Sequence, residues 1–194
     1  MGRKLAFDKD KALETSMNNF WAKGYDATSM RDLADSLGLH LGSVYNALGD
    51  KEKVFEAALK LNLDKHVMPR ILEFSKSADA PAALRGFLDQ VSRECNDPVA
   101  HPGCFMFNSL QNVTSINDSI TGVIHGFLKD MEDAFTEFFE RARKTSQISR
   151  DKDPRMLARY LLSVIYSMRV LSKLKVPQAT VDDVKAFALR TILE

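Results

Sequence analysis

The feature that most constrains the fold is the stretch 28–48, whose pattern predicts two short helices joined by a tight turn. Gly38 is placed to end the first helix, because such a turn needs a positive φ that glycine adopts at little cost. Ala34 stands four residues before Gly38 and Val44 six residues after it. A small residue and a turn glycine at this spacing are what a helix-turn-helix requires.

The start of this stretch carries a second signal. Ser29 and Asp32 have the spacing of a capping box, in which each side chain caps the other residue's backbone N–H. Leu33 and Leu37 follow on one face of the helix, and Leu48 closes the second helix against the same core. These positions together predict a DNA-binding motif at about 29–48.

Composition allows one large domain or two smaller ones in 194 residues, with 45% hydrophobic and 27% charged side chains. The N-terminus lacks an apolar signal core, and no apolar run is long enough to span a bilayer. We therefore expect a cytoplasmic protein with no membrane partner. Cys95 and Cys104 form no disulfide framework.

Charge does not point to DNA. Residues 1–60 carry nine basic and nine acidic side chains, whereas a DNA-binding domain usually has a basic excess. A positive surface would have to come from the placement of the charges.

The rest of the chain is predicted to be helical, which gives an all-α fold. The first helix is expected to start near Asp8, and a fourth helix to run from Asp50 to about His66, with Pro69 bending or ending it. Later helices are expected after Asp79, with an apolar stripe from Leu84 to Cys95, and at about 118–143, 154–173 and 180–193, the last with a capping box at Thr180 and Asp183.

The N-terminal motif resembles the DNA-binding domain of the TetR family of transcriptional regulators. The resemblance covers about residues 7–60 and has a specific order and spacing. Its positions are Phe20, Gly24-Tyr25-x-x-Thr28-Ser29, Leu33-Ala34, Gly38, Gly42-Ser43-Val44-Tyr45 and Lys51-Glu52. The chain departs from the family at Ala47 and Leu48, where His and Phe are common, so a phosphate contact from that His is missing.

The resemblance implies a homodimer with a three-helix DNA-binding domain over 6–66 and a C-terminal helical bundle over 67–194 that binds an effector and pairs the subunits. The function implied is a transcriptional regulator, most simply a repressor released from operator DNA by a small-molecule or electrophile effector. The alternative is a ligand- or protein-binding helical module with little specific DNA binding, which the balanced charge would suit.

The motif assigns DNA contacts. The second helix is expected to enter the major groove, with phosphate contacts from residues flanking it. The predicted DNA-binding residues are Thr28, Ser29, His40, Leu41, Gly42, Ser43, Tyr45, Asn46 and Lys51.

The sequence offers little chemistry for an enzyme. Phosphate-binding loops and nucleophile motifs are absent, and no cofactor is expected. His101 and Cys104 could begin a metal site with Cys95 or His125, but no second paired motif supports it, so no metal is predicted.

An effector pocket is expected in the C-terminal bundle, whose Phe and Met side chains suit an apolar ligand. Cys104 is either a thiolate sensor at a helix start or simple pocket lining, whereas Cys95 is predicted to be inert core. Asn108 and Gln111 either orient the ligand or cap a helix. The candidate pocket residues are Cys104, Phe105, Phe107, Asn108, Gln111, Phe127, Met131 and Tyr166.

The last two helices are apolar on more than one face, which predicts that a second subunit covers part of them. The predicted dimerisation residues are Leu161, Ile165, Met168, Val184, Ala188, Leu189 and Ile192. The fourth helix is expected to be the only covalent connection between the two domains, and hence the element that transmits effector binding to the DNA-binding domain.

Overall fold

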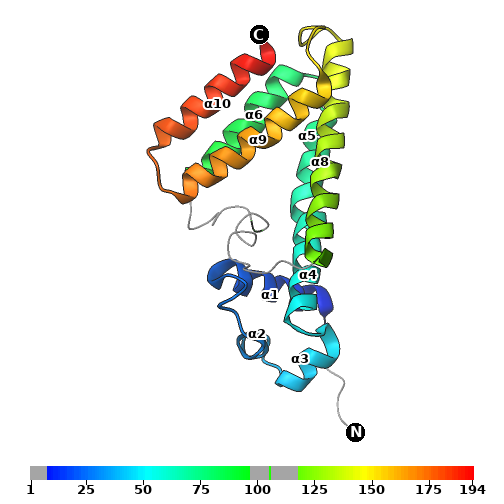
Figure 1. The fold of residues 1–194 in the computed structure, drawn as a ribbon, viewed down its shortest axis with the longest axis vertical. Helices are drawn as coiled ribbons and strands as arrows, with labels where there is room; N and C mark the ends of the chain where they lie inside the picture. Colours follow the sequence, from blue (N-terminus) through cyan, green and yellow to red (C-terminus); the bar gives the residue numbers. More distant parts are fainter. Residues whose placement is uncertain (1–7, 97–104, 106–117) are drawn as a thin grey trace. The chain divides into compact units, whose positions relative to one another are not determined.

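The protein is all-α, as predicted. A computed structural model describes residues 8–96, 105 and 118–194, and over these ranges it contains helices and no strand (Figure 1). The helices are α1 (Lys9–Lys23), α2 (Met30–Leu37), α3 (Leu41–Leu48), α4 (Lys51–Asn62), a π-helix (Leu63–Val67), α5 (Met68–Ser75), α6 (Ala80–Asn96), α8 (Asp118–Lys144), α9 (Pro154–Lys173) and α10 (Gln178–Leu193). None of them is long and apolar enough to cross a membrane.

The chain folds as two compact units, and the first is not a single stretch of sequence. It comprises Met1–Val67 together with Phe105–His125, and the second comprises Met68–Cys104 and Gly126–Glu194. The predicted domain boundary near residue 66 placed all later residues in the second domain, whereas Phe105–His125 belongs to the first unit. The expectation that the fourth helix is the only covalent connection is therefore wrong, because α8 also passes from one unit to the other.

The first unit is built on α1, which packs against α2 and α4, while α2 packs against α3. Asp8 caps α1 by accepting a hydrogen bond from the Lys11 N–H at 3.1 Å. Gly24 ends the helix at φ 88°, and its N–H donates to the Phe20 carbonyl. The core side chains of this unit include Leu13, Met17, Phe20, Leu33, Ala34, Val44, Leu48, Val54, Phe55, Ala58 and Leu59.

The predicted fourth helix is interrupted before its proline. α4 ends at Asn62, and a π-helical turn over Leu63–Val67 leads into α5. Pro69 is the second residue of α5, which follows the π-turn directly, so its missing N–H falls where the regular hydrogen-bond ladder is already interrupted. The regular α-helix is thus interrupted at the π-turn Leu63–Val67, just before Pro69, rather than at the proline itself.

In the second unit α6, α9 and α10 pack against one another, and Phe side chains join α5 and α6 to α8. The Phe74 ring lies 4.7 Å from Phe87 and 4.4 Å from Phe138, centroid to centroid. Asp153 caps α9 as predicted, accepting from the Met156 N–H at 2.8 Å. The start of α10 was predicted wrongly, because the helix begins at Gln178 directly after Pro177 and no capping box forms at Thr180.

Candidate nucleic-acid interface

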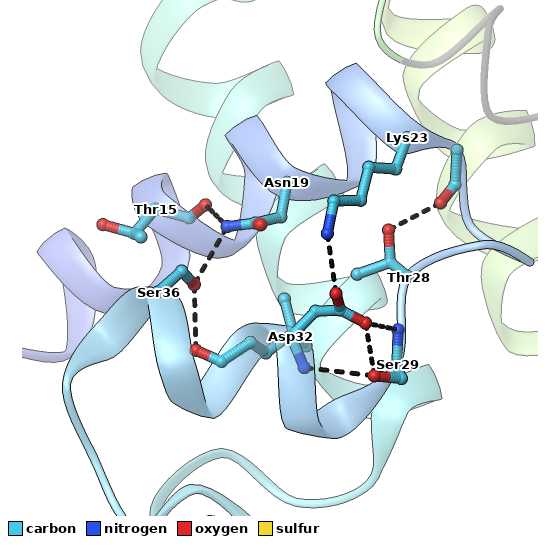
Figure 2. Close-up of polar contacts among 9 residues, drawn as sticks. Thr15, Asn19, Lys23, Thr28, Ser29, Asp32 and Ser36 are labelled. Carbon is cyan, nitrogen blue, oxygen red and sulfur yellow. Dashed lines mark hydrogen bonds and ion pairs between the residues drawn. The ribbon is translucent and has the colours of Figure 1, made fainter.

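The predicted capping box at the start of α2 is present. The Asp32 N–H donates to Ser29 Oγ at 3.1 Å, and the Ser29 N–H donates to Asp32 Oδ2 at 2.8 Å (Figure 2). Lys23 at the end of α1 donates to the other carboxylate oxygen, Oδ1, at 2.6 Å. The Lys23 and Ser29 hydrogen bonds hold the pKa of Asp32 well below its usual range. This carboxylate therefore caps α2 and fastens it to α1 at the same time.

A second polar contact ties α2 to α1 near the other end of α2. Asn19 Nδ2 lies 2.9 Å from the Thr15 carbonyl and 3.0 Å from Ser36 Oγ. Ser36 in turn donates to the Leu33 carbonyl at 2.9 Å. Figure 2 shows both contacts, Lys23 with Asp32 and Asn19 with Ser36, bridging the two helices. Held at two points, α2 cannot rotate on α1 without breaking one of them.

The turn into α3 has the geometry that the sequence predicted. Gly38 adopts φ 63° and ψ 31°, the left-handed region, and the Leu39 N–H donates back to the Ala34 carbonyl at 3.0 Å. Ala34 is buried, so α2 and α3 meet across a small side chain. The orientation of α3 is thus fixed by the turn as well as by its own core contacts.

α3 has one buried face and one exposed face. Val44 and Leu48 are buried in the core of the first unit, while Leu41 is 36% and Tyr45 46% exposed. An ideal Cβ at Gly42 would meet no atom within 4 Å, so this part of the surface is open. The predicted α3-region DNA-contact residues all lie on the exposed side: His40, Leu41, Gly42, Ser43, Tyr45 and Asn46.

Thr28 was predicted to hold a phosphate, and the structure contradicts that role. Its side chain is fully buried, and its hydroxyl donates to the Gly24 carbonyl at 2.7 Å. Thr28 therefore closes the turn between α1 and α2 rather than facing DNA (Figure 2). Ser29 is exposed, but its hydroxyl already takes part in the capping box. It can still lie against DNA because of its position on the surface.

Lys51 lies at the start of α4, beside the exposed face of Tyr25. Its ammonium is 4.3 Å from the centre of the Tyr25 ring and donates to the Asp26 carbonyl at 3.3 Å. Burial, together with the charges of the Glu52, Asp26 and Asp50 carboxylates, raises the pKa of Tyr25. The environment of Lys51 is thus partly acidic, which weakens the local positive potential that a phosphate would meet.

Several charged side chains of the first unit are paired with one another. Lys65 lies 2.8 Å from Asp10, and Lys60 lies 2.6 Å from Glu56. Arg31, in contrast, is exposed in the first turn of α2 and forms no ion pair with any residue in the described ranges. The sequence reasoning missed it, although a basic residue two positions after an N-cap is a visible signal. Arg31 adds a positive charge beside Ser29.

The predicted effector pocket is not assembled by the described residues. Cys104, Phe107, Asn108 and Gln111 lie outside them. Phe105 is 1% exposed and belongs to the core of the first unit, with its ring 5.8 Å from both Trp21 and Phe55. Its role as a pocket residue stays a prediction.

The remaining pocket candidates lie in the second unit. Phe127 and Met131 are buried along α8, and Tyr166 is half-buried on α9. Cys95 is buried, its thiol lies 3.5 Å from the Met168 carbonyl, and burial raises the pKa of this thiol. Cys95 therefore lies in the core, as predicted, and its inertness stays a prediction. His101, the other half of the weak metal signal, lies outside the described residues.

Four of the predicted dimerisation residues belong to the core of the single chain. Each has no exposed surface, so none can contact a second subunit: Leu161, Met168, Ala188 and Ile192. Ile165 and Leu189 are also buried, and Val184 is half-buried. The four fully buried residues belong to the stripe that packs α9, α10 and α6 together, whereas Val184 stays a candidate dimerisation residue. Dimerisation itself stays a prediction and needs another face.

An all-helical chain whose N-terminal unit holds a capped α2, a glycine turn and an exposed α3 belongs to the class of helix-turn-helix regulators. Comparison with known families identifies which one. The family model "Bacterial regulatory proteins, tetR family" matches residues 12–58, and "Tetracyclin repressor-like, C-terminal domain" matches residues 80–187. The chain belongs to the tetR family of bacterial regulatory proteins, and it is a transcriptional regulator rather than an enzyme.

Curated relatives agree with this assignment. The chain is 25% identical over 173 residues to the HTH-type transcriptional repressor ComR of Escherichia coli, covering 89% of this chain and 82% of ComR. It is 26% identical over 184 residues to the HTH-type regulator YezE of Bacillus subtilis, covering 94% and 95% of the two chains.

Two solved structures show the same fold. A cysteine mutant of the TetR family regulator CifR, complexed with 26-base-pair operator DNA, has a TM-score of 0.79 at 25% identity, covering 97% of this chain and 98% of that one. The reduced form of NemR from E. coli has a TM-score of 0.85 at 14% identity over 96% and 97% of the chains, and this likeness concerns the fold alone.

Proposed function

We propose that this protein is a repressor that binds operator DNA as a homodimer, with α3 of each subunit in the major groove. The observation that carries the proposal is the exposed face of α3 on a rigidly held support. The Lys23–Asp32 and Asn19–Ser36 contacts fix α2, and buried Val44 anchors α3. A CifR structure of the same fold is complexed with operator DNA, which supports this use of the helix.

The exposed side chains suggest a division of roles. Leu41 can contact a thymine methyl group, Gly42 allows the backbone close to the bases, and Asn46 can pair with a base edge, with His40 and Ser43 beside them. Tyr45 and Lys51, with Arg31 added by the structure, are assigned to phosphates, which position the helix without reading sequence. Thr28 takes no part in this assignment.

The roles of Asn46 and Tyr45 can be separated by two variants. Asn46→Ala is expected to weaken binding to the preferred sequence by about 1–3 kcal/mol and to relax the base preference at one position in each half-site. Tyr45→Phe removes one neutral hydrogen bond and is expected to cost about 1 kcal/mol on every sequence alike. Fluorescence anisotropy with duplexes that vary each base in turn would measure both. A Tyr45→Phe variant with altered base preference would refute the assignment.

The proposed dimer uses the outer faces of α9 and α10. Exposed or half-buried residues recur on both helices at the alternating three- and four-residue spacing of helix pairs. Met156 is 69% exposed and Phe187 57% exposed, and both project from the second unit. The stripe consists of Met156, Tyr160, Ser163, Ser167, Val170 and Leu174 with Thr180, Val184, Phe187 and Thr191. A second copy can cover this stripe isologously. To bind one face of B-DNA, the two copies of α3 must then meet successive major grooves, about 34–36 Å apart.

Phe187→Glu tests this face. We expect a folded monomer at micromolar concentration, because the side chain is exposed in the single chain but would be desolvated in the dimer. Leu72→Glu is the matched control, since Leu72 is also an exposed large apolar residue (42%) but lies on α5. Sedimentation velocity would give the oligomeric state and circular dichroism the fold. A Phe187→Glu protein that still dimerises like the control would reject this face.

We further propose that an effector bound in the C-terminal unit releases the DNA. Such a ligand must bind the non-DNA-binding conformation more tightly, and its effect equals that difference in affinity. Phe127 and Met131 remain candidate ligand contacts, as does half-buried Tyr166. The CifR structures are of cysteine mutants, which makes a thiol-directed electrophile the first class of effector to try.

A further inference from the structure

Three helices of the second unit meet at one buried carboxylate. The side chain of Glu94 on α6 is 9% exposed, and it accepts a hydrogen bond from Arg70 on α5 through Oε1 and one from Arg169 on α9 through Oε2. Gln90, one turn earlier on α6, also donates to Oε1, at 3.3 Å. Both oxygens of Glu94 are therefore occupied, and one residue holds the two guanidinium groups close to each other.

This cluster of Arg70, Glu94 and Arg169 carries an excess of positive charge. Two guanidinium groups face one carboxylate, and within the described part of the chain neither arginine pairs with a second acidic side chain. The acids at the nearby contact of α6 with α10, Asp89 and Asp182, pair with Lys185 instead. The cluster therefore has one positive charge more than it has negative charges.

Arg169 also has more hydrogen-bond donors than the protein uses. A guanidinium group carries five N–H donors, and among the described residues Arg169 donates only to Glu94, through Nη2. Its side chain is 14% exposed, so the donors on Nε and Nη1 have limited access to water and would gain from an acceptor. Arg70 is 45% exposed, which gives the cluster a side that is open to solvent.

Stability alone does not account for such a cluster. Removing charged groups from water costs about as much as their mutual attraction returns, and uncharged packing of the same volume is often equally stable. The cluster does provide preorganisation, because Glu94 fixes two arginines from helices distant in the sequence, so that they lose little freedom when a ligand binds. The planar fork of an arginine matches a carboxylate and can bind it through two parallel N–H···O bonds.

We propose that Arg70 and Arg169, held by Glu94, form an anion-binding site whose ligand is a small organic acid. The carboxylate of the acid accepts from the remaining guanidinium N–H groups and neutralises the excess charge of the cluster. The role of this acid as the effector that releases DNA rests on the proposed function, whereas its binding does not. An acidic ligand is compatible with a thiol-directed effector, because an electrophile can also carry a carboxylate.

Binding is tested on the free, full-length protein by isothermal titration calorimetry at constant ionic strength. The probes are hexanoate and benzoate, each compared with its neutral amide, and inorganic phosphate as an anion without an organic part. We expect saturable binding of the acids, about tenfold tighter than of the amides, because hydrogen bonds between charged groups are the stronger ones. The proposal would be overturned by acids that do not bind, by amides that bind equally well, or by phosphate that binds more tightly than both acids.

Two variants test the residues of the site in opposite directions. Arg70→Gln removes the excess charge at an exposed position and should weaken binding of the acids about tenfold. Glu94→Gln keeps an acceptor for one arginine but removes the competing negative charge, so a folded variant should bind the acids about threefold more tightly than the wild type. Arg85→Gln is the matched control, since Arg85 is an exposed arginine of α6 without an ion pair in the described ranges.

The outcomes of these variants decide between a ligand site and a structural cluster. Arg70→Gln that binds the acids as tightly as Arg85→Gln would overturn the proposal. So would a folded Glu94→Gln protein that binds them more weakly than the wild type. If Glu94→Gln does not fold, the comparison of Arg70→Gln with Arg85→Gln is sufficient.

The consequence for DNA is tested on duplexes that the wild type enriches from random-sequence DNA. The acids should lower the affinity of the wild type for these duplexes, and Arg70→Gln should need about ten times more acid for the same effect. Equal DNA affinity with and without bound acid would overturn the effector role. Failure of the proposed function would look different, because the wild type would then enrich no duplex at all while the calorimetric result could still hold.

Discussion

Phe105→Ala is expected to lower the free energy of unfolding of the first unit by about 3–5 kcal/mol, the usual cost of deleting a buried phenylalanine. The ring is 1% exposed and lies 5.8 Å from both Trp21 and Phe55. Phe55 also contacts Phe20 and Tyr25, at 5.1 and 4.8 Å. Removing Phe105 leaves a cavity in the aromatic cluster that supports α1 and α4.

Trp21 makes the measurement direct, because it is the only tryptophan of the chain and lies against Phe105. Urea unfolding followed by tryptophan emission therefore reports the unit that has been changed. Phe187→Ala is the control, since it deletes an exposed phenylalanine of the second unit. If Phe105→Ala lowered the urea midpoint of the Trp21 transition no more than Phe187→Ala does, Phe105 would not belong to this core. The division of the chain into units would then be wrong.

The second large effect is expected for Glu94→Gln, which should lower the free energy of unfolding of the second unit by about 3 kcal/mol. The Glu94 carboxylate is buried and accepts hydrogen bonds from Arg70 on α5 and Arg169 on α9, one on each oxygen. The neutral amide would leave two guanidinium groups without their counter-charge. The cost lies at the lower end of the range for buried pairs because Arg70 is 45% exposed and keeps part of its hydration.

This carboxylate also gives stability a pH dependence of definite sign. Burial raises the pKa of Glu94, but the hydrogen bonds and charges of Arg169 and Arg70 outweigh it and hold the pKa below its ordinary value. A group with a lowered pKa in the folded state contributes stability above its unfolded pKa, about 4.3, and loses it as pH falls through the folded value. The difference in unfolding free energy between wild type and Glu94→Gln should therefore be full at pH 7 and shrink below about pH 4. Glu137→Gln, on an exposed part of α8, should show no such difference; a constant difference for Glu94→Gln across pH would contradict the ionic origin.

Local sequence signals predicted several helix caps and the turn of the helix-turn-helix correctly. The Ser29–Asp32 capping box, the turn at Gly38 and the Asp153 cap of α9 are each set by residues within a few positions of one another, so spacing alone identifies them. Thr28 shows the limit of this reasoning, because a hydroxyl next to an N-cap can face either phosphate or the preceding turn. Only the burial of its side chain against Gly24 decides between the two.

Long-range features could not be obtained in the same way. Nothing in the residues around Phe105 indicates that it joins Trp21 and Phe55, since these residues lie 84 and 50 positions away in the sequence. The two apolar stripes of α9 also have the same helical period, and the inner one, which contains Leu161 and Met168, was taken for the dimer face. Periodicity shows that a helix has two faces to cover, but it does not show which face the rest of the chain covers.

The central claim is that the exposed face of α3 reads a specific DNA sequence. The most direct measurement is repeated selection of the purified full-length protein on random-sequence duplex DNA, followed by sequencing, with Asn46→Ala carried in parallel. We expect the wild type to enrich a two-fold symmetric site whose half-sites are centred about 10 base pairs apart or a multiple of that. In Asn46→Ala the base preference at one position of each half-site should be relaxed. A folded wild-type protein that enriches no site, or a variant that enriches an identical one, would contradict it and favour the ligand- or protein-binding module.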